Sequence, residues 1–434
     1  MSRSGAPPPV LLPVSTRLPN GLAVAVAPLP HLHTVTIVAG VKVGSRHESP
    51  AQSGISHFLE HMLFRGTAEH PTAFEFNLAV EQLGGTLQAA THADFTTYEL
   101  TLPPDALGEG VALVSEIFHA PALANLELER KIVLEEILDG VDEDGRDVDP
   151  DDVAHRALFG SHPLGHKVAG TDAAVRRLRR EDLHAWHARH YVARNTSIAL
   201  AGAVEPEAAL ALVERGFGRL APGERATPAP VAALGRGPRT TSIEDTGSQA
   251  DVRIVMPGVG HDDPLRTASE MLSRVLDDGM SARLFRTLIE DQGLAYDAFA
   301  TYDPYEDVGL WLVGAAVEHG KAAALIRSAL SLLAELRDRP IEARELEKAK
   351  TRALFELRAL RDQAAAVADL VAVDRLFDRE PSLEAEAARI EAVGLSELAA
   401  AARAIVPDHL QVIVVGALDE AVERETRKIV SAFR

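Results

Sequence analysis

The chain has 434 residues, a length that suits two or three domains better than a single hydrophobic core. Its 46% hydrophobic and 25% charged residues can form a sizeable core, which excludes a disordered chain. Its 64 acidic and 44 basic residues give a formal net charge of -20, which argues against nucleic-acid binding and favours cationic partners, basic peptides among them.

Cysteine is absent, which excludes disulfides, thiolate nucleophiles and cysteine-ligated metals. Any metal must therefore be held by His, Asp or Glu. The sequence shows no signal peptide and no run of about 18 uncharged apolar residues. We therefore expect a cytoplasmic protein without a membrane span.

Predicted strands and helices alternate along the first half of the chain. Runs rich in β-branched and aromatic residues predict strands, and apolar residues at helical spacing predict helices. Thr72 and Glu75 have the spacing of a capping box, which predicts a helix start. The predicted strands are 35–43, 86–91, 95–102 and 196–202, and the predicted helices are 53–64, 72–83, 105–119, 126–138 and 172–188.

A segment rich in Pro, Gly and Ala, residues 221–239, predicts a linker between two domains, residues 1–220 and 240–434. The alternation then begins again. It predicts strands at 251–257, 309–316 and 410–416, a helix at 264–276, long helical segments within 320–379 and a last helix after residue 416.

The second half resembles a diverged copy of the first. A shift of 213 residues lays Leu59 on Leu272 and Gly66 on Gly279. A chance match between apolar helices is the alternative interpretation. We expect an α+β fold with two related domains, each a mainly antiparallel sheet packed with helices.

His57, Glu60 and His61 form the motif that carries chemistry. Residues four apart share a helix face, so the two imidazoles can point at one metal ion, and Glu60 lies about 60° around the axis from His57. A carboxylate beside such a pair can take a proton from water at the metal. The alternative is a helix with two incidental histidines.

The predicted helix at 126–138 offers a third ligand. Seven residues make almost two turns, so Glu129 and Glu136 point the same way, whereas Glu135 lies about 100° from Glu136. One of the aligned pair can bind the metal, and the other can support a ligand from outside.

The inverted order His-x-x-Glu-His is the inverzincin signature. The chain resembles the pitrilysin (insulinase) family, in its small two-domain branch of mitochondrial processing peptidase β-subunits and bacterial processing proteases. The similarity covers nearly the whole chain. The matching segments are residues 57–67, 84–91, 129–136, 162–165, 170–171, 279–285 and 293–296.

The resemblance implies one zinc ion per chain, bound by His57, His61 and Glu136. It makes Glu60 the general base and Glu129 a supporting glutamate. The second half should bind no zinc, because the residues 213 positions after His57, Glu60 and His61 are a Glu, a Ser and an Arg.

The resemblance also implies that substrates bind as an added strand along residues 86–91. The substrate-binding residues would be Leu87, Gln88, Ala89 and Ala90. The family usually has Asn in the place of Gln88, which leaves the role of this amide open.

A second departure concerns the partner. Family members that grip substrate backbone through an Arg/Tyr pair carry the Arg seven residues before the Tyr; here Tyr296 is present, but that position is Ile289. The chain therefore resembles the metal subunit of a heterodimer, whose homologous partner lacks the metal motif and supplies the pair. In the alternative, Arg286 substitutes within a homodimer.

Two other clusters have a structural interpretation. His184, His187 and His190 are expected on a polar helix face, and the acidic run at 135–152 is expected to be a solvated loop that could lie at the rim of the cleft.

The sequence predicts a zinc-dependent endopeptidase acting on peptides or unfolded segments in an enclosed chamber. The alternative is a non-catalytic assembly subunit of the same fold, like the core proteins of respiratory complexes. The metal content of the purified chain separates the two.

Overall fold

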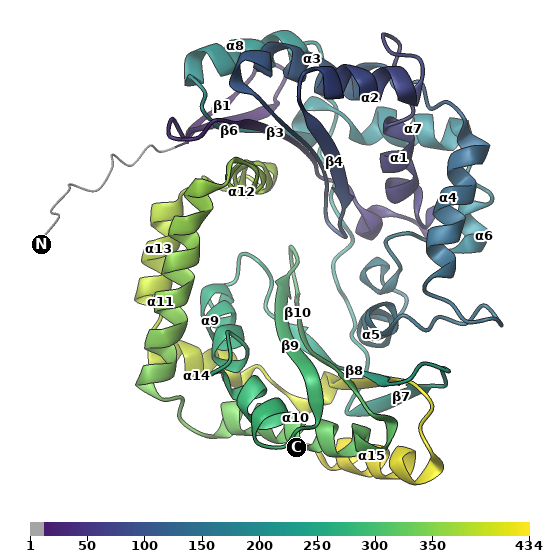
Figure 1. Ribbon diagram of the computed structural model, residues 1–434, viewed down its shortest axis with the longest axis vertical. Coiled ribbons are helices and arrows are strands. Elements are labelled where there is room, and N and C mark those ends of the chain that lie inside the picture. The colour runs from purple at the N-terminus through teal and green to yellow at the C-terminus, as the bar shows by residue number, and fades with distance from the viewer. Residues whose placement is uncertain (1–12) are drawn as a thin grey trace, which may run out of the picture.

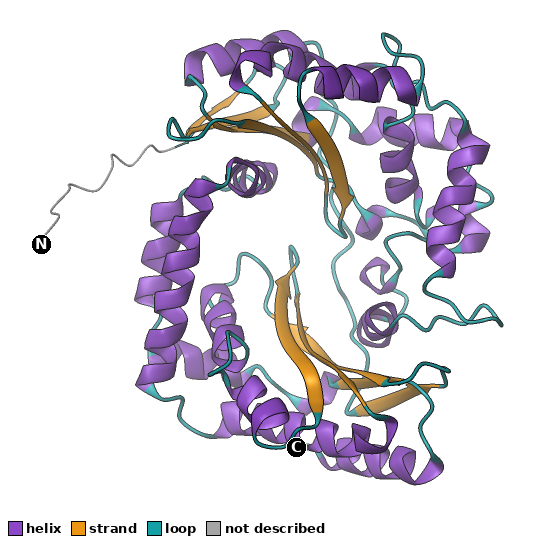
Figure 2. Cartoon of the chain, viewed as in Figure 1, coloured by secondary structure: helices purple, strands orange, loops and turns teal. Residues whose placement is uncertain are grey.

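The computed structural model describes residues 13–434, which form two sheets with helices around them (Figures 1 and 2). The expected α+β class is confirmed. The first sheet contains β1 (Val14–Arg17), β2 (Ala23–Pro28), β3 (Val35–Val41), β4 (Thr86–Thr91), β5 (Thr96–Leu102) and β6 (Thr196–Gly202). The second contains β7 (Arg239–Ile243), β8 (Ala250–Gly258), β9 (Ala295–Pro304), β10 (Gly309–Val317) and β11 (Gln411–Val415).

The helices divide between the two halves of the chain. The first half carries α1 (Ile55–Leu63), α2 (Ala73–Gln82), α3 (Leu107–His119), α4 (Leu126–Leu138), α5 (Pro150–Phe159), α6 (Asp172–Val175), α7 (Arg180–His190) and α8 (Pro206–Phe217). The second carries α9 (Arg266–Leu276), α10 (Ala322–Asp338), α11 (Ala343–Ala359), α12 (Ala364–Leu376), α13 (Leu383–Ala392), α14 (Leu395–Arg403) and α15 (Glu420–Ala432).

The two sheets share one strand order, which supports the predicted duplication. The first runs β1-β2-β6-β3-β5-β4 and the second β7-β11-β8-β10-β9, so they match strand by strand apart from β1. Each has one parallel pair, β2 with β6 and β7 with β11. Gly66 and Gly279 both have positive φ, 111° and 85°, a conformation that favours glycine.

Each half lends one helix to the inner face of the other half's sheet (Figure 1). Helix α12 packs on β2, β3 and β6, where its Val367, Ala368 and Val371 join a small apolar core. Helix α5 packs on β8 and β11 through Val153 and Leu158. Helix α5 is the third α-helix after β5, and α12 is the third α-helix after β10. Because β5 and β10 occupy equivalent places in the two strand orders, the exchange fits the predicted duplication.

Three predicted features differ from the structure. The predicted helix at 172–188 is broken into α6 and α7, because the Asp182 carboxylate accepts the backbone N–H of Arg179 and starts a new helix there. Of the three histidines, His187 and His190 are buried and His184 is exposed. The predicted polar histidine face is therefore wrong for two of its three members.

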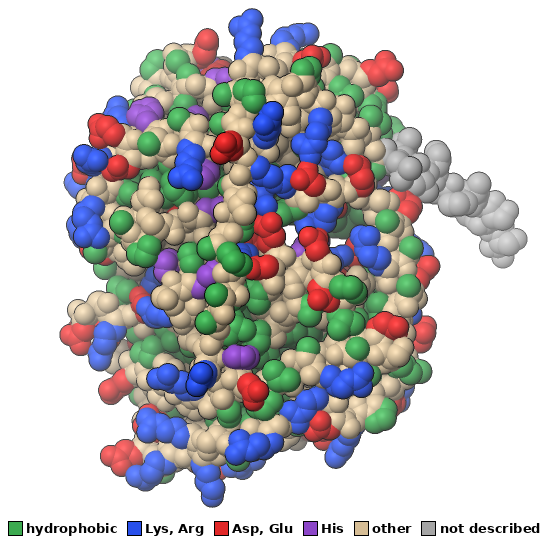
Figure 3. Space-filling view, turned by 180° about the vertical axis from the view of Figure 1, so that it is seen from behind, with side chains coloured by type: hydrophobic (Ala, Val, Ile, Leu, Met, Phe, Trp, Pro, Cys, Tyr) green, Lys and Arg blue, Asp and Glu red, His purple; other side chains and the backbone are tan. Residues whose placement is uncertain are grey.

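The prediction of a solvated acidic loop at 135–152 is also wrong in part. Its first residues continue α4, and its last residues begin α5 with Asp149 as the N-cap. Asp147 and Asp152 pair with Lys167, and Asp151 pairs with Arg253 of β8 at 2.7 Å. Figure 3 shows acidic and basic side chains interspersed over one face of the molecule.

Residues 221–238 contain no helix or strand, and β7 begins at Arg239. The domain boundaries at 220 and 240 stay a prediction. Every helix within residues 13–434 is too short or too polar to cross a bilayer.

The exchanged helices lead to a first prediction. A fragment ending at residue 238 should show no cooperative urea unfolding by circular dichroism, because the inner sheet face loses α12 and the apolar face of α5 becomes exposed. Mixing it with residues 239–434 should restore the transition. As a control, the full chain cleaved within residues 226–234 should stay assembled. Cooperative unfolding of the isolated first fragment would contradict the prediction.

Candidate metal centre

Helix α1 carries the motif and is fixed at its N-terminus. The carboxylate of Glu48 accepts the backbone N–H groups of Gly54 and Ser56 at 2.7 and 2.9 Å, which satisfies two free donors of the first turn. Burial raises the pKa of Glu48 to about 7, although these hydrogen bonds act in the opposite direction. Gly54 has φ 88° and lies against Ala169, whose oxygen would be 2.5 Å from an added Cβ.

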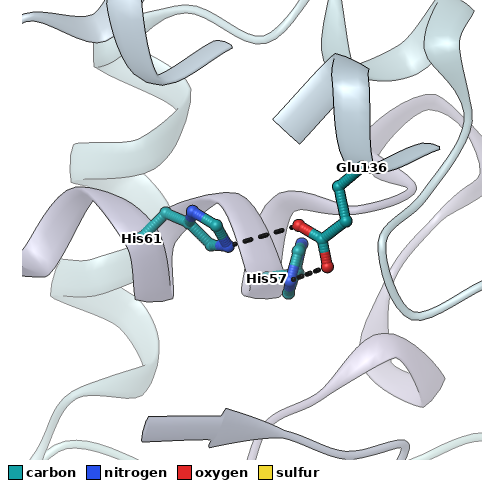
Figure 4. A group of neighbouring side chains, drawn as sticks. All are labelled: His57, His61 and Glu136. Carbon is teal, nitrogen blue, oxygen red and sulfur yellow. Dashed lines mark ion pairs between the residues drawn. The ribbon is translucent and has the colours of Figure 1, made fainter. Parts of the chain in front are cut away.

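The structure brings His57, His61 and Glu136 together (Figure 4). His57 Nε2 lies 3.5 Å from one carboxylate oxygen of Glu136, and His61 Nε2 lies 3.6 Å from the other. One ligand atom from each residue lies within 4.8 Å of the other two. Two imidazole nitrogens and a carboxylate oxygen are a donor set that zinc accepts.

The surroundings shift the pKa values of the two imidazoles in opposite directions. Burial and then the neighbouring His61 lower the pKa of His57 to about 4, so His57 is neutral at pH 7. Burial acts to lower the pKa of His61, but its hydrogen bond to Glu129 and the nearby carboxylates raise it overall. The Glu136 side chain is about half exposed, which leaves the group open to solvent.

Glu129 and Glu136 of α4 make different contacts with the two histidines. Glu136 faces both imidazoles, whereas Glu129 is only 3% exposed and accepts a hydrogen bond from His61 Nδ1 at 2.9 Å. Arg65 pairs with the same carboxylate. This contact fixes the His61 ring with Nε2 toward the metal group. Glu135 is exposed.

Glu60 of α1 lies near His61 and Glu136 and contacts the end of strand β4. Thr91 Oγ1, at the end of β4, donates a hydrogen bond of 2.6 Å to a carboxylate oxygen of Glu60. Burial raises the pKa of Glu60, Thr91 and His61 oppose the rise, and Glu136 adds to it. A raised pKa makes this carboxylate a stronger base than an ordinary glutamate.

Strand β4 is one of the two edge strands of the first sheet, and its residues alternate in exposure. Leu87 and Ala89 pack toward the first core. Gln88 and Ala90 are exposed, and the Gln88 amide donates to Glu99 at 3.0 Å. The predicted substrate residues thus lie on an edge whose backbone can accept another strand.

The predicted clamp residues lie on the second half. Tyr296 is 94% exposed on β9, the free edge of the second sheet. Ile289 packs against the second core, and Arg286 is exposed with Nε 4.0 Å from Asp291.

At the equivalent place in the second half, an ion pair stands where the first half has His57, His61 and Glu136. Arg274 stands at the position offset from His61, on α9, and its guanidinium lies 2.6 Å from Glu356 of α11. Within residues 13–434, His57, His61 and Glu136 form the one set of three His, Asp or Glu side chains whose ligand atoms meet.

Three contacts at this site were not predicted: Glu48 with α1, Arg65 with Glu129, and Thr91 with Glu60. Arg65 lies in the turn just after α1, so helical spacing from His61 does not signal its contact with Glu129.

Comparison with known proteins gives a consistent result. The insulinase family, peptidase family M16, matches residues 23–172, and the peptidase M16 inactive domain matches residues 177–353. An uncharacterized zinc protease of Mycobacterium tuberculosis is 32% identical over 422 residues, 94% of each chain. Another, of Streptomyces coelicolor, is 28% identical and covers 93% of this chain and 90% of its own.

Solved structures share the fold. A protease from Helicobacter pylori has a TM-score of 0.86 at 24% identity, covering 94% of this chain and 100% of that chain. The peptidase M16 inactive domain from Pseudomonas fluorescens has a TM-score of 0.84 at 19% identity, covering 94% and 98%.

The contact between Glu129 and His61 leads to a second prediction. Glu129→Gln should lower zinc affinity by about 10- to 100-fold, because the neutral amide holds His61 and Arg65 less well. Competition with a chelator of known affinity measures this. Glu135→Gln, an exposed change on the same helix, is the matched control and should keep wild-type affinity. Equal affinities in the two variants would contradict the role of Glu129.

Proposed function

The chain belongs to the insulinase family of zinc peptidases, peptidase family M16, and on that premise we propose that it is itself a zinc-dependent endopeptidase. The proposal assigns the metal to His57, His61 and Glu136, and the general base to Glu60. One observation carries it: Glu60 lies beside the ligand group and is held by Thr91 of the free edge strand.

The chain's own residues supply positioning and proton transfer. Zinc, when bound, would supply Lewis-acid chemistry that polarises the scissile carbonyl and makes the attacking water more acidic. Glu60 takes a proton from that water and passes it to the leaving amine. Glu129 holds the His61 ring, and Thr91 holds the Glu60 carboxylate.

The substrate lies along β4 in this proposal. The backbone groups of residues 87–90 on the free edge pair with an extended peptide, so recognition depends little on sequence. The net charge of -20 favours basic peptides. The exposed Gln88 amide bonds Glu99 of β5, which lies on the other side of β4 from the bound peptide.

A second chain completes the chamber. Ile289 packs against the second core, so Tyr296 lacks the arginine of the family's Arg/Tyr pair. This favours a homologous partner that supplies the pair. A homodimer that uses the exposed Arg286 is the alternative. The sedimentation coefficient and peptidase activity of the chain alone distinguish these arrangements.

A third prediction tests the general base. Glu60→Gln should keep one zinc per chain and lose about 10²- to 10⁴-fold in peptide cleavage, because an amide cannot accept the proton while it still accepts the hydrogen bond of Thr91. The measurements are zinc content and cleavage of unstructured peptides, basic ones included, with the homologous partner where one is needed.

Glu135→Gln is the control and should retain both zinc and cleavage. Undiminished cleavage by Glu60→Gln would exclude Glu60 as the base. A wild-type chain that binds no zinc and cleaves no peptide would favour the non-catalytic assembly subunit.

A further inference from the structure

Arg46 is a buried charge at the junction of the two halves. It follows β3 in the short turn Ser45–His47, and its side chain is 1% exposed. Its guanidinium bonds Asp94 through Nη1 at 3.2 Å and, through Nη2, both Asp307 and the carbonyl oxygen of Ala229 at 3.2 Å. A buried guanidinium with this many fixed partners has little freedom to move.

Three separate segments meet at this one side chain. Asp94 lies in the turn between β4 and β5, Asp307 in the turn between β9 and β10, and Ala229 in the predicted linker. The second carboxylate oxygen of Asp94 accepts the backbone N–H of Glu306 at 3.0 Å. The contacts therefore join the tips of one hairpin from each sheet.

The backbone around Arg46 also contacts the β4–β5 turn. Its N–H donates to the carbonyl oxygen of Ala93 at 2.9 Å, and the N–H of Ser45 donates to His92 at 3.3 Å. Gly44 approaches so closely that an added Cβ would lie 2.0 Å from the His92 oxygen. The turn that follows β4 is thus held by both the backbone and the side chain of this segment.

That turn leads directly to the candidate base. Thr91, the last residue of β4, precedes His92 and donates the hydrogen bond to Glu60. Glu60 shares helix α1 with His57 and His61, so what sets it apart is its carboxylate contact: Thr91 holds Glu60, whereas Glu129 holds His61. A shift of the turn would therefore displace the substrate edge and weaken the Thr91 hold on the Glu60 carboxylate, while the contact between Glu129 and His61 stays in place.

We propose that Arg46 is a positioning residue for peptide hydrolysis, which holds the end of β4 so that Glu60 and the substrate edge keep a fixed place relative to the metal ligands. This role rests on the proposed function. Arg46 acts through Asp94 and Thr91 and touches neither the substrate nor the metal group.

The chain offers a matched control in Lys42. This residue also joins the halves, because its ammonium lies 2.9 Å from Glu306 and 5.0 Å from the ring centre of Phe377. Its side chain is buried like that of Arg46, but it contacts Glu306 rather than Asp94. Loss of Lys42 removes a charge between the halves and leaves the direct contacts of Arg46 with the β4–β5 turn in place.

The experiment compares Arg46→Lys with Lys42→Met in the full-length chain. A lysine carries one compact ammonium and cannot span Asp94, Asp307 and the Ala229 carbonyl together. Arg46→Lys should lower kcat by about 10- to 100-fold, as expected for a small misplacement of a reacting group, and leave KM and zinc affinity within about twofold. Lys42→Met should keep kcat within about twofold of wild type.

A second measurement does not depend on activity. Hydrogen exchange of the backbone amides in residues 86–95, followed by mass spectrometry, should be faster in Arg46→Lys and unchanged in Lys42→Met. Asp307→Asn, a milder change at a partly exposed carboxylate, should shift kcat and exchange in the same direction as Arg46→Lys.

Unchanged kcat or unchanged exchange in Arg46→Lys would overturn the proposal, as would an equal loss of kcat in Lys42→Met. A wild-type chain without peptide hydrolysis would refute the proposed function instead. The exchange comparison alone would then uphold or overturn the role of Arg46 in holding β4.

Discussion

The reciprocal exchange of α5 and α12 is the constraint on which the rest of the structure depends. A sheet in a two-layer domain must cover its apolar face, and here the cover for each inner face comes from the other half of the chain. The exchange also ties the metal centre to the second half. Helix α4, which carries Glu136, leads through residues 139–149 into α5, and Asp151 of α5 pairs with Arg253 of the second sheet.

The duplicated framework links equivalent helices in two chemical ways. In the first half, the side chains of α1 and α4 converge as two imidazoles and a carboxylate, which a cation can bridge. In the second half, α9 and α11 are joined by Arg274 and Glu356, an ion pair that brings its own positive charge. One scaffold thus holds either a metal-ligand set or an ion pair between the same two helices, which agrees with the match of the second half to an inactive domain.

Local signals in the sequence predicted most elements and the core of the site. The capping box at Thr72 starts α2 as expected, and the helical face shared by Glu129 and Glu136 places both beside the histidines. Strands β1, β2, β7 and β9 and helices α5, α8, α13 and α14 were missed. So was the placement of α5 and α12, because an apolar helix face does not specify which sheet will cover it. Thr91 could not be linked to Glu60, since their contact depends on how β4 packs beside α1.

Two sets of contacts hold the candidate centre: one lies within the first half, and the other reaches the second half. His61, Glu129 and Arg65 form a chain of contacts within the first half, so the His61 ring can keep its orientation while the halves move. Glu60 instead depends on Thr91, whose strand ends at a turn that Arg46 ties to the second half. Because a small misplacement of a reacting group can lower a rate strongly, the orientation of the halves should affect the proposed base, Glu60, before it affects the orientation of His61.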